Sequence, residues 1–413
     1  MKMLAAACVL SLAALPVAAA EPDGLILPPG FHASVVAEGL GEFTRHMAFG
    51  DASHLYVSTE PQTKDAANQG IMALHLDAKH HADTLAHFST IHNGTAIAVY
   101  KGALYASSPN TLYRFKLSGK ELVPTSKPEI VIDGIPGRAA IAFDDKNNLF
   151  VAVGGGGNVC APDGTPRTAK SVGPMPCPIL ETRAGVWRFD AAKMGQAWTQ
   201  GEHYATGIRD TNALAFAHGA LFSVMYGRDA AEKAYPEIIS AEDGAHISDE
   251  MFKVVKGTDM GWPYTYYDSA KHVRLAQPEY GGDGKTVVTD AKYAAPVAGF
   301  PAHVAPMDIA FYNAAKFPTA YRGGAFIAFH GSGGGDPNGH DDGYNVMFAP
   351  LDKSGKVGAP QVFAEGFAGT GRDAKNGKRA QYRPVGVTVG PDGALYISES
   401  QKGRIWRVAY GND

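Results

Sequence analysis

The sequence predicts an all-β fold, a six-bladed β-propeller, and three observations support this prediction. One pattern recurs six times: a polar start, a run of small and apolar residues, a Gly or Asn turn, and a second strand with an aromatic or aliphatic side chain. The 49 Gly and 26 Pro residues favour short strands joined by turns over long helices. Further strand-like segments follow several copies, as the blades of a propeller require.

The six copies are unevenly spaced but keep the pattern. Their strand pairs are expected at residues 45–49 with 54–57, 93–99 with 102–105, 138–143 with 148–151, 212–216 with 219–222, 307–311 with 324–327, and 385–389 with 393–397. Third strands are expected at 111–115, 185–189 and 403–408. A β-sandwich is the alternative, but six similar hairpins argue against it.

The early segment 31–36 is expected to pair with the last repeat and close the ring. Closure would remove the free strand edges that an open sheet leaves. We therefore expect one propeller domain over residues 21–413, although the length alone would also allow two domains.

Residues 1–20 have the features of an export signal. Lys2 supplies a positive charge, residues 4–17 an apolar core, and residues 18–20 a small-residue cleavage site. A membrane anchor is the alternative, but the apolar core is short for a bilayer. We expect a periplasmic or secreted protein with no membrane span in the mature chain.

Cleavage would remove Cys8 and leave Cys160 and Cys177. Two cysteines in an oxidising compartment predict one disulfide, whereas a thiolate metal site would need more ligands. The net charge is −4 and the chain has no basic run, so nucleic acid is not an expected partner.

The polar residues that precede the inner strands are the candidates for a functional site. The first strand of each blade lines the channel of a propeller, so these residues ring one mouth of it, and convergent polar groups mark binding sites. The expected ring contains His92, Asn93, Arg138, Arg209, Asp210, His303 and Arg383. Small residues should line the axis itself, namely Ala48, Ala98, Ala142, Ala215 and Ala310. Insertions at 152–182, 226–259 and 330–345 are expected to cover the mouth as lids.

The arginines of this ring suit an anionic ligand. A guanidinium offers a planar fork that matches carboxylate or phosphate, and Arg138, Arg209, Arg383 and Arg228 are the candidates. The alternative is that some of them form structural ion pairs with nearby aspartates. Because imidazole titrates near neutral pH, His92 and His303 are the candidate bases, against the alternative of hydrogen-bonded structural histidines.

A set of motifs in order along the chain resembles the glucose/sorbosone dehydrogenase family. The motifs lie at 204–209 (YATGIR), 226–229 (YGRD), 261–264 (GWPY), 302–306 (AHVAP), 329–332 (FHGS) and 383–387 (RPVGV). Members of that family are soluble six-bladed quinoprotein sugar dehydrogenases that use pyrroloquinoline quinone (PQQ) and Ca²⁺. The resemblance implies a cofactor with three carboxylates over the channel mouth, which would explain converging arginines.

The resemblance also implies roles for individual residues. The family's cofactor-binding Arg-Asn pair corresponds to Arg209 and Asp210, and its last-blade arginine to Arg383. A segment that gives one PQQ contact and two Ca²⁺-binding carbonyls corresponds to Asp243, Gly244 and Ala245.

The sequence departs from the family at two positions. Where the family has its catalytic histidine, this chain reads Ile135-Pro136-Gly137-Arg138, so His92 or His303 would have to replace the base. The family's Trp-Asn-Arg after the His-Gly-Ser stretch is replaced by glycines at 333–335, which removes a cofactor-side cation.

Three functions follow from the sequence. The first is a PQQ- and Ca²⁺-dependent dehydrogenase of an aldose or related aldehyde sugar, which passes electrons to an external acceptor. The second is a degenerate propeller that binds a sugar-like or anionic ligand without turnover. The third is a lactonase-type hydrolase, which is disfavoured because few acidic side chains fall at inner positions of the repeats.

Overall fold

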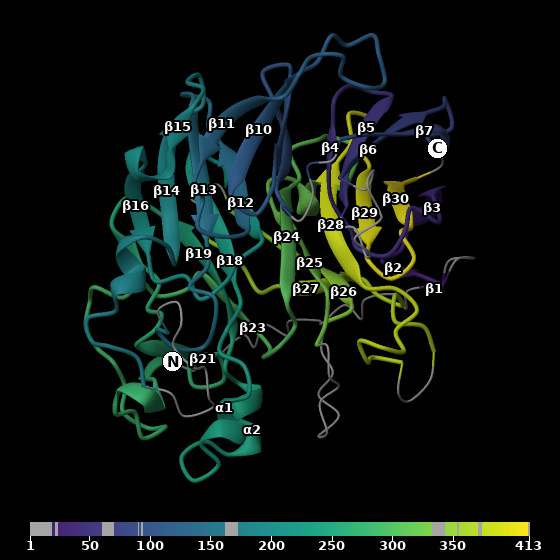
Figure 1. Ribbon diagram of the computed structural model, residues 1–413. Coiled ribbons are helices and arrows are strands. Elements are labelled where there is room, and N and C mark those ends of the chain that lie inside the picture. Colours follow the sequence, from purple (N-terminus) through teal and green to yellow (C-terminus); the bar gives the residue numbers. More distant parts are fainter. Residues whose placement is uncertain are drawn as a thin grey trace, which may run out of the picture.

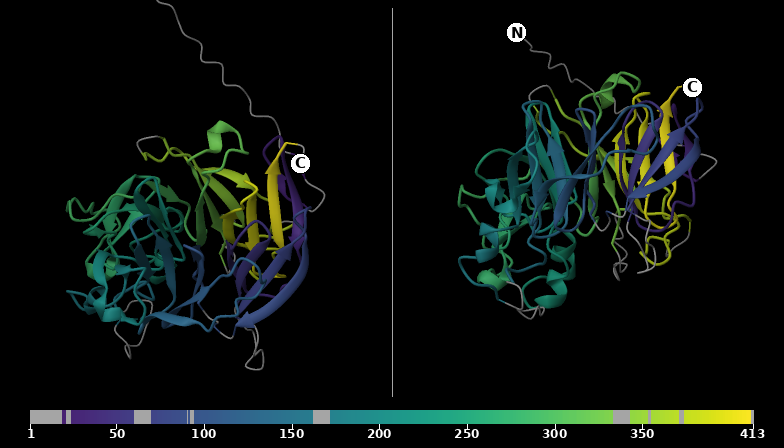
Figure 2. Two further views of the ribbon diagram at one scale, coloured as in Figure 1. Left: turned by 90° about the horizontal axis from the view of Figure 1, so that it is seen from above. Right: turned by 45° about the horizontal axis from the view of Figure 1, so that its top comes forward.

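The computed structural model describes residues 19–20, 24–59, 70–89, 91, 94–161, 172–332, 343–352, 355–370 and 374–411. Six sheets are arranged around a central axis as the blades of a propeller (Figures 1 and 2). The predicted all-β, six-bladed fold is confirmed.

Each blade begins with a strand at the axis and continues outward. Blade 1 contains β4 (Thr44–Phe49), β5 (His54–Thr59), β6 (Ile71–Leu76) and β7 (Ala82–Ser89). Blade 2 contains β8 (Ile97–Tyr100), β9 (Ala103–Ser107), β10 (Thr111–Lys116), β11 (Glu129–Asp133) and the outer β15 (Gln196–Ala197). Blade 3 contains β12 (Ala139–Phe143), β13 (Asn148–Val153), β14 (Gly185–Asp190), β16 (Glu202–Thr206) and the outer β20 (Thr258–Asp259).

The other three blades have four strands each. Blade 4 contains β17 (Ala213–Ala217), β18 (Ala220–Met225), β19 (Asp249–Val254) and β23 (Ala298–Phe300). Blade 5 contains β24 (Pro306–Phe311), β25 (Ala325–Phe329), β26 (Asn345–Ala349) and β27 (Gln361–Ala364). Blade 6 contains β28 (Pro384–Val389), β29 (Leu395–Glu399), β30 (Ile405–Tyr410) and β3 (Phe31–Ala37). The six predicted strand pairs all lie in these blades.

The ring is closed in two ways. Each inner strand contacts the inner strand of the next blade, and β28 contacts β4. In blade 6, β3 pairs antiparallel with β30, so the first long strand of the chain completes the last blade, as predicted. This joint places both ends of the propeller in one sheet and leaves no gap between first and last blades.

Two of the hairpins use the turn chemistry that their sequences indicate. The loops Lys101-Gly102 and His218-Gly219 contain two residues each, and both residues have positive φ, at 46° and 73° and at 50° and 72°. Such turns match the twist of antiparallel strands, and glycine adopts positive φ without steric cost.

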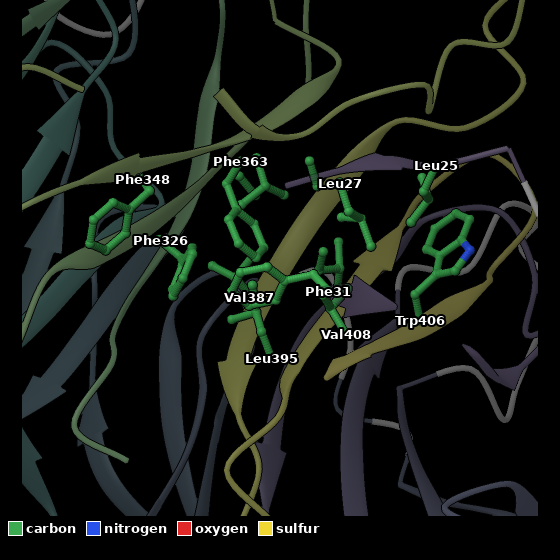
Figure 3. Packing of buried hydrophobic residues seen from close by; sticks show 14 of the residues in the cluster. Leu25, Leu27, Phe31, Phe326, Phe348, Phe363, Val387, Leu395, Trp406 and Val408 are labelled. Atoms are coloured by element: carbon green, nitrogen blue, oxygen red, sulfur yellow. The ribbon is translucent and has the colours of Figure 1, made fainter. Parts of the chain in front are cut away.

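Apolar side chains fill the spaces between blades. Between blades 5 and 6, the ring centroid of Phe363 lies 5.0 Å from that of Phe31 and 4.6 Å from that of Phe326 (Figure 3). Val387 and Trp406 belong to the same cluster. Strands covered on both faces are therefore almost continuously apolar, and each fully buried side chain stabilises the fold by about 1.5–3 kcal/mol.

The remaining elements are short and lie mainly in insertions. They are the helices α1 (Ala231–Ala234) and α2 (Ala241–Ala245), the 3-10 helices η1 (Pro178–Glu181), η2 (Trp198–Gln200), η3 (Pro278–Tyr280) and η4 (Thr319–Tyr321), and the strand pairs β1 (Ala19–Ala20) with β2 (Ile26–Leu27) and β21 (Thr265–Asp268) with β22 (Val273–Ala276). No helix in the described part of the chain is both long and apolar enough to cross a membrane.

The insertion after β18 lies at the channel end where the inner strands begin. Val224 pairs with Ala213 at the start of β17, so the chain leaves β18 at that end. In Figure 1, α1, α2 and β21 form an extension below the blades on this side. The first part of the expected lid at 226–259 therefore lies at the expected mouth, but its last part is wrong, because residues 249–254 and 258–259 are the blade strands β19 and β20. Parts of the other two lids, 162–171 and 333–342, lie outside the described residues.

The predicted disulfide is confirmed. Cys160 and Cys177 are joined with an S–S distance of 2.03 Å and are buried with Ile179 and Trp262. The bond therefore closes a loop within the insertion of blade 3, and this loop packs against Trp262 of the 261–264 motif.

Candidate active site at the channel mouth

A cavity of about 340 Å³ lies on the propeller axis and is lined by all six inner strands. Its polar wall residues include His46, Asn212, Asp308 and Thr388. Among the predicted small residues, Ala48, Ala98 and Ala310 line it. The prediction is wrong for two others, since Ala142 and Ala215 pack in the clusters between blades.

The loop between β16 and β17 holds Arg209 at the mouth. The Arg209 carbonyl accepts a hydrogen bond from the amide of Gly155 at 2.8 Å. Gly207 has a φ of 84°, and a Cβ at this position would lie 2.5 Å from a carboxylate oxygen of Asp259. Only glycine satisfies both constraints, so this motif residue fixes the direction in which the chain enters the site.

Arg209 forms a network with two side chains from two other loops, Asn158 and Asp229. Its Nε donates to Oδ1 of Asn158 at 2.9 Å, and its Nη2 forms an ion pair with Asp229. The Asn158 Oδ1 also accepts the amide of Asp229, and its Nδ2 donates to the Asp229 carbonyl at 3.0 Å. Asn158 thus joins the loop after β13 to the loop after β18.

The second oxygen of Asp229 holds His303. The Asp229 Oδ1 lies 3.1 Å from Nδ1 of His303, whose side chain is 32 % exposed. In the neutral imidazole Nδ1 carries the proton that this carboxylate accepts, so Nε2 carries the lone pair. The hydrogen bond to Asp229 raises the pKa of His303, against the opposing effect of burial. This is the arrangement of an oriented general base.

The same contacts act on Asp229. Burial would raise the pKa of this carboxyl, but the hydrogen bond from His303 and the charge of Arg209 outweigh it and lower the pKa to about 2. Asp229 is therefore a carboxylate at any pH at which the protein would work, and it keeps the His303 tautomer fixed.

A fully buried carboxyl group supports this pair from behind. Asp249, at the start of β19, accepts the amide of Gly227 at 2.6 Å and the amide of Ala305 at 2.9 Å. Burial raises the pKa of Asp249 to about 7, although both amides oppose the shift. Asp249 links the chain on each side of the network, two residues from Asp229 and two from His303.

Two arginines act on Asp210. Asp210 is exposed, but the protein atoms that surround it raise its pKa, against the charges of Arg209 and Arg138. Arg138 is itself exposed. Of the two expected cofactor contacts at this position, Arg209 thus supplies positive charge, beside an aspartate whose pKa is raised by burial.

Two further arginines lie across the mouth. Arg383 donates to the carbonyls of His330 at 3.0 Å and Gly331 at 2.6 Å, which accept hydrogen bonds but carry no formal charge. Burial lowers the pKa of Arg383, and the charge of Arg45 adds to this effect. Burial and the same two arginines lower the pKa of His330 well below its usual value, so His330 is neutral.

The floor of the mouth is polar. The amide of Asn212 donates to the hydroxyl of Tyr226 at 3.0 Å, and this hydroxyl contacts Sδ of Met307. The Met307 carbonyl lies 2.7 Å from Nε2 of His46, which must therefore be the donor. Hydrogen-bonding groups thus continue from the mouth into the cavity.

Arg228 does not lie with the other predicted arginines. Its Nη1 donates to Gln277 Oε1 at 2.9 Å and to Glu279 Oε2 at 2.6 Å, and its Nη2 lies 2.6 Å from Glu279 Oε1. The side chains of Arg228 and Glu279 are 1 % and 0 % exposed. Arg228 therefore has the structural ion pair that the sequence left open as an alternative.

The three residues assigned to cofactor and Ca²⁺ binding lie in α2. The carboxylate of Asp243 is 2.7 Å from Nζ of Lys271, in an ion pair that is separate from the Arg209 network. The Gly244 carbonyl accepts the amide of Ile247, and the Ala245 carbonyl accepts the amide of Ala302, next to His303. Each carbonyl oxygen keeps a second lone pair that a cation can use.

His92, the other candidate base, and Asn93 lie outside the described residues. The structure therefore brings together Arg209, Asp210, His303, Arg138 and Arg383, with His303 as the histidine that a carboxylate orients. Among the described residues, no group of three or more His, Cys, Asp or Glu side chains is arranged to hold a metal ion.

Several residues of the site were missed from the sequence. Arg45 starts the first repeat as Arg138 and Arg383 start theirs, so comparing the repeats with one another could have found it. Asn158 and Asp249 left no comparable signal, because their partners are distant in sequence.

A comparison with sequence models of protein families shows which family this chain belongs to. A sequence model of the family described as TrAA12-like matches residues 25–411. The chain belongs to this family. The family model covers nearly the whole propeller.

Solved structures share the fold of this TrAA12-like protein. The holo form of the pyranose dehydrogenase PQQ domain from Coprinopsis cinerea is 18 % identical, with a TM-score of 0.71 over 94 % of this chain and 98 % of that one. A calcium structure of the family AA12 protein from Trichoderma reesei is 17 % identical, with a TM-score of 0.70 over 94 % and 97 %. The apo form of the soluble aldose sugar dehydrogenase from Escherichia coli is 17 % identical, with a TM-score of 0.58 over 92 % and 99 %.

A search of curated proteins adds one partial match. A protein of Borreliella burgdorferi, described as uncharacterized, is 28 % identical over 151 residues. The match spans 36 % of this chain and 35 % of that protein, about a third of the relative's length.

Proposed function

We propose that this protein is a PQQ- and Ca²⁺-dependent oxidoreductase that oxidises an aldose or related sugar, with His303 as the general base. The observation that carries the proposal is the His303–Asp229–Arg209 network at the channel mouth of a TrAA12-like propeller. In this network His303 is the base, Asp229 orients it, and Arg209 supplies a positive charge for the cofactor. The names of two similar structures, a PQQ domain of a pyranose dehydrogenase and an aldose sugar dehydrogenase, support the reaction class.

The residues at the mouth fit a cofactor with three carboxylates. Arg209 and Arg138 supply positive charge on one side of the mouth, and Arg383 and Arg45 supply it on the other side. Among the described residues Arg383 donates to the neutral carbonyls of His330 and Gly331, so its charge remains to attract an anion. Guanidinium groups in a partly buried site bind carboxylates through short, charge-assisted hydrogen bonds.

When bound, PQQ would supply the acceptor for the two electrons removed from the sugar. The protein's own contribution is the movement of one proton and the orientation of the groups around it. Nε2 of His303 accepts the proton of the sugar hydroxyl, and Asp229 stabilises the imidazolium that forms. Asp249 fixes the backbone on either side, so the base keeps its position.

Oxygen donors near His303 could hold Ca²⁺. Oε2 of Glu232 is buried without a hydrogen-bond partner among the described residues, and a Cβ on Gly244 would lie 2.9 Å from it. The charge of Glu232 also reaches His303. Oxygen donors from Glu232 and from the carbonyls of Gly244 and Ala245 are the ligand type that Ca²⁺ prefers.

The direct test is reconstitution of the purified mature protein with PQQ and Ca²⁺, followed by dye reduction across a panel of aldoses. PQQ binding is measured separately by absorbance titration. Binding with sugar-dependent dye reduction supports the proposal. Binding without reduction by any sugar supports a non-catalytic ligand-binding propeller instead, and no PQQ binding overturns the proposal.

The arginine assignment has a matched control within the chain. Arg383→Gln is expected to weaken PQQ binding by roughly 10- to 150-fold, since a hydrogen bond to a charged group contributes about 1.5–3 kcal/mol. Arg322 also donates to two backbone carbonyls, those of Phe317 and Ala315, but it lies outside the mouth. Arg322→Gln should leave PQQ affinity unchanged, and equal losses in both variants would refute the assignment.

The base is tested by His303→Gln. We expect kcat to fall by about 10²- to 10⁴-fold with PQQ affinity retained, because only proton transfer is lost. His218→Gln, in a hairpin turn at the other channel end, is the control and should keep full activity. Unchanged turnover in His303→Gln would move the base to another residue, with His92 as the remaining sequence candidate.

Location and partners follow from the same proposal. The Cys160–Cys177 disulfide is typical of an oxidising compartment and supports export to the periplasm or the medium through the predicted signal at residues 1–20. The partners would be a sugar substrate and an external electron acceptor.

A further inference from the structure

Two histidines on blade 1 face each other at the channel end opposite the mouth. His54 begins β5 and His75 lies near the end of β6, and the two are directly paired in the antiparallel register. Directly opposed residues of neighbouring strands point their side chains to the same face of the sheet. The two ring centroids are 5.8 Å apart, with the planes tilted by 59°.

Each of these histidines is held by an aspartate through the same ring nitrogen. Nδ1 of His54 is 2.8 Å from Oδ2 of Asp51, and Nδ1 of His75 is 2.7 Å from Oδ1 of Asp83. A carboxylate at Nδ1 keeps the proton there and leaves the lone pair on Nε2. Among the described residues, the hydrogen bonds of both rings are made through Nδ1.

The two aspartates are carboxylates at neutral pH. The Asp83 pKa is lowered chiefly by its hydrogen bond from His75. For Asp51, burial would raise the pKa, but the Ser53 amide and His54 together lower it. Carboxylate-backed imidazoles are the usual ligands of protein-bound zinc, because the second hydrogen bond fixes the ring and raises its basicity.

We propose that His54 and His75 bind a divalent transition-metal ion through their Nε2 atoms, with water completing the coordination. With a Zn–N bond of about 2.0–2.1 Å, two tetrahedrally placed imidazoles have ring centroids about 5.2 Å apart. The observed centroid separation of 5.8 Å lies within about 0.6 Å of that value. The side chain of His75 is 39 % exposed and that of His54 11 % exposed, so an ion reaches the site from the solvent.

The chemistry of the donors selects the metal. Imidazole nitrogen suits Zn²⁺, Ni²⁺ and Cu²⁺, and Cu²⁺ stands highest in the Irving–Williams order. Ca²⁺ prefers oxygen ligands, so this site and the proposed Ca²⁺ site at the mouth take different ions. The inference is therefore independent of the proposed enzymatic function.

The test is calorimetric titration of the full mature chain, without an affinity tag and saturated with Ca²⁺, with ZnCl₂. The wild-type protein should bind one Zn²⁺ that His75→Gln and His54→Gln lose. His81→Gln and His87→Gln alter exposed histidines of the same blade and should retain binding. Asp83→Asn should weaken binding by about 10- to 100-fold, because it removes only the supporting hydrogen bond.

Two further readouts separate a specific site from weak surface binding. Zn²⁺ should raise the Tm of the wild-type protein but not that of His75→Gln, since an ion that binds only the folded state stabilises it. Cu²⁺ should give an electron paramagnetic resonance spectrum with two coordinated nitrogens. Retained Zn²⁺ affinity in His75→Gln, or an equal loss in His81→Gln, would overturn the proposal.

Discussion

Two ion pairs that start from adjacent residues show how this protein separates stability from function. Arg228 pairs with Glu279 where both side chains are essentially inaccessible, at 1 % and 0 % exposure. Asp229 pairs with Arg209 at the channel mouth, where the aspartate side chain is 55 % exposed and also holds His303. The first pair anchors an insertion and the second forms the candidate active site, although the sequence presents them as neighbours in one motif.

The physical difference between the pairs lies in solvation. Two buried charges have lost their hydration, so each depends on its partner, whereas water can replace either partner of an exposed pair. Loss of Glu279 should therefore damage the fold and loss of Asp229 the chemistry. The predictions below test this contrast.

The largest effect is expected for Glu279→Ala. Removing one partner leaves the Arg228 charge buried and uncompensated, which should lower the free energy of unfolding by about 3–5 kcal/mol. Urea denaturation followed by far-UV circular dichroism measures the change. The control is the double variant Arg228→Met with Glu279→Met, in which much of the loss should be recovered. A loss under 1 kcal/mol in Glu279→Ala would contradict the burial argument.

A smaller, pH-dependent effect is expected for Asp249→Asn. The folded-state pKa of Asp249 is raised from 3.8 to about 7, so the native state holds its proton more tightly than the unfolded chain does. This carboxyl therefore lowers stability as the pH rises from about 4 to about 7, by up to about 4 kcal/mol. At pH 4 the Asp249→Asn variant should be less stable than the wild type, because it has lost a hydrogen bond. Between pH 4 and pH 7 it should lose less stability than the wild type does.

The control for this prediction is Asp283, whose contribution to stability changes with pH in the opposite direction. The pKa of the exposed Asp283 is lowered to about 2 by the amides of Lys285 and Thr286, so its contribution is present above the unfolded pKa and is lost as the pH falls. Asp283→Asn should therefore reduce stability at pH 7 more than at pH 2. Denaturation midpoints at several pH values measure both variants, and identical slopes in Asp249→Asn and wild type would refute the assignment.

The smallest effect on stability is expected for Asp229→Asn, within about 1 kcal/mol, since the pair with Arg209 is partly exposed. Its effect should fall on catalysis. The carboxylate raises the pKa of His303, so its removal should lower that pKa and move the acidic limb of kcat/KM to lower pH, with a reduced kcat. A pH profile of dye reduction measures the shift, and an unmoved limb would separate Asp229 from the base.

The sequence was sufficient for the fold because the information was local and repeated. Each repeat carries its own alternation and its own turn, as at Lys101-Gly102 and His218-Gly219, and the blade emerges from neighbours in the chain. The ring of arginines followed from the same repeats, since a residue before an inner strand must lie at the mouth. The same reasoning did not place Arg228 correctly. This residue follows an inner hairpin, where the repeat no longer determines the direction of the chain.

The sequence by itself thus determined the six blades, their closure by the segment 31–36, the disulfide and the position of Arg209, Arg383 and His303 at one mouth. Only the tertiary structure decided that Asp229 rather than Asp210 pairs with Arg209, and that Asp249 holds both loops. These contacts join residues 20 to 74 positions apart in insertions without a repeat. Their geometry depends on how the loops pack over the channel, and no local pattern encodes that packing.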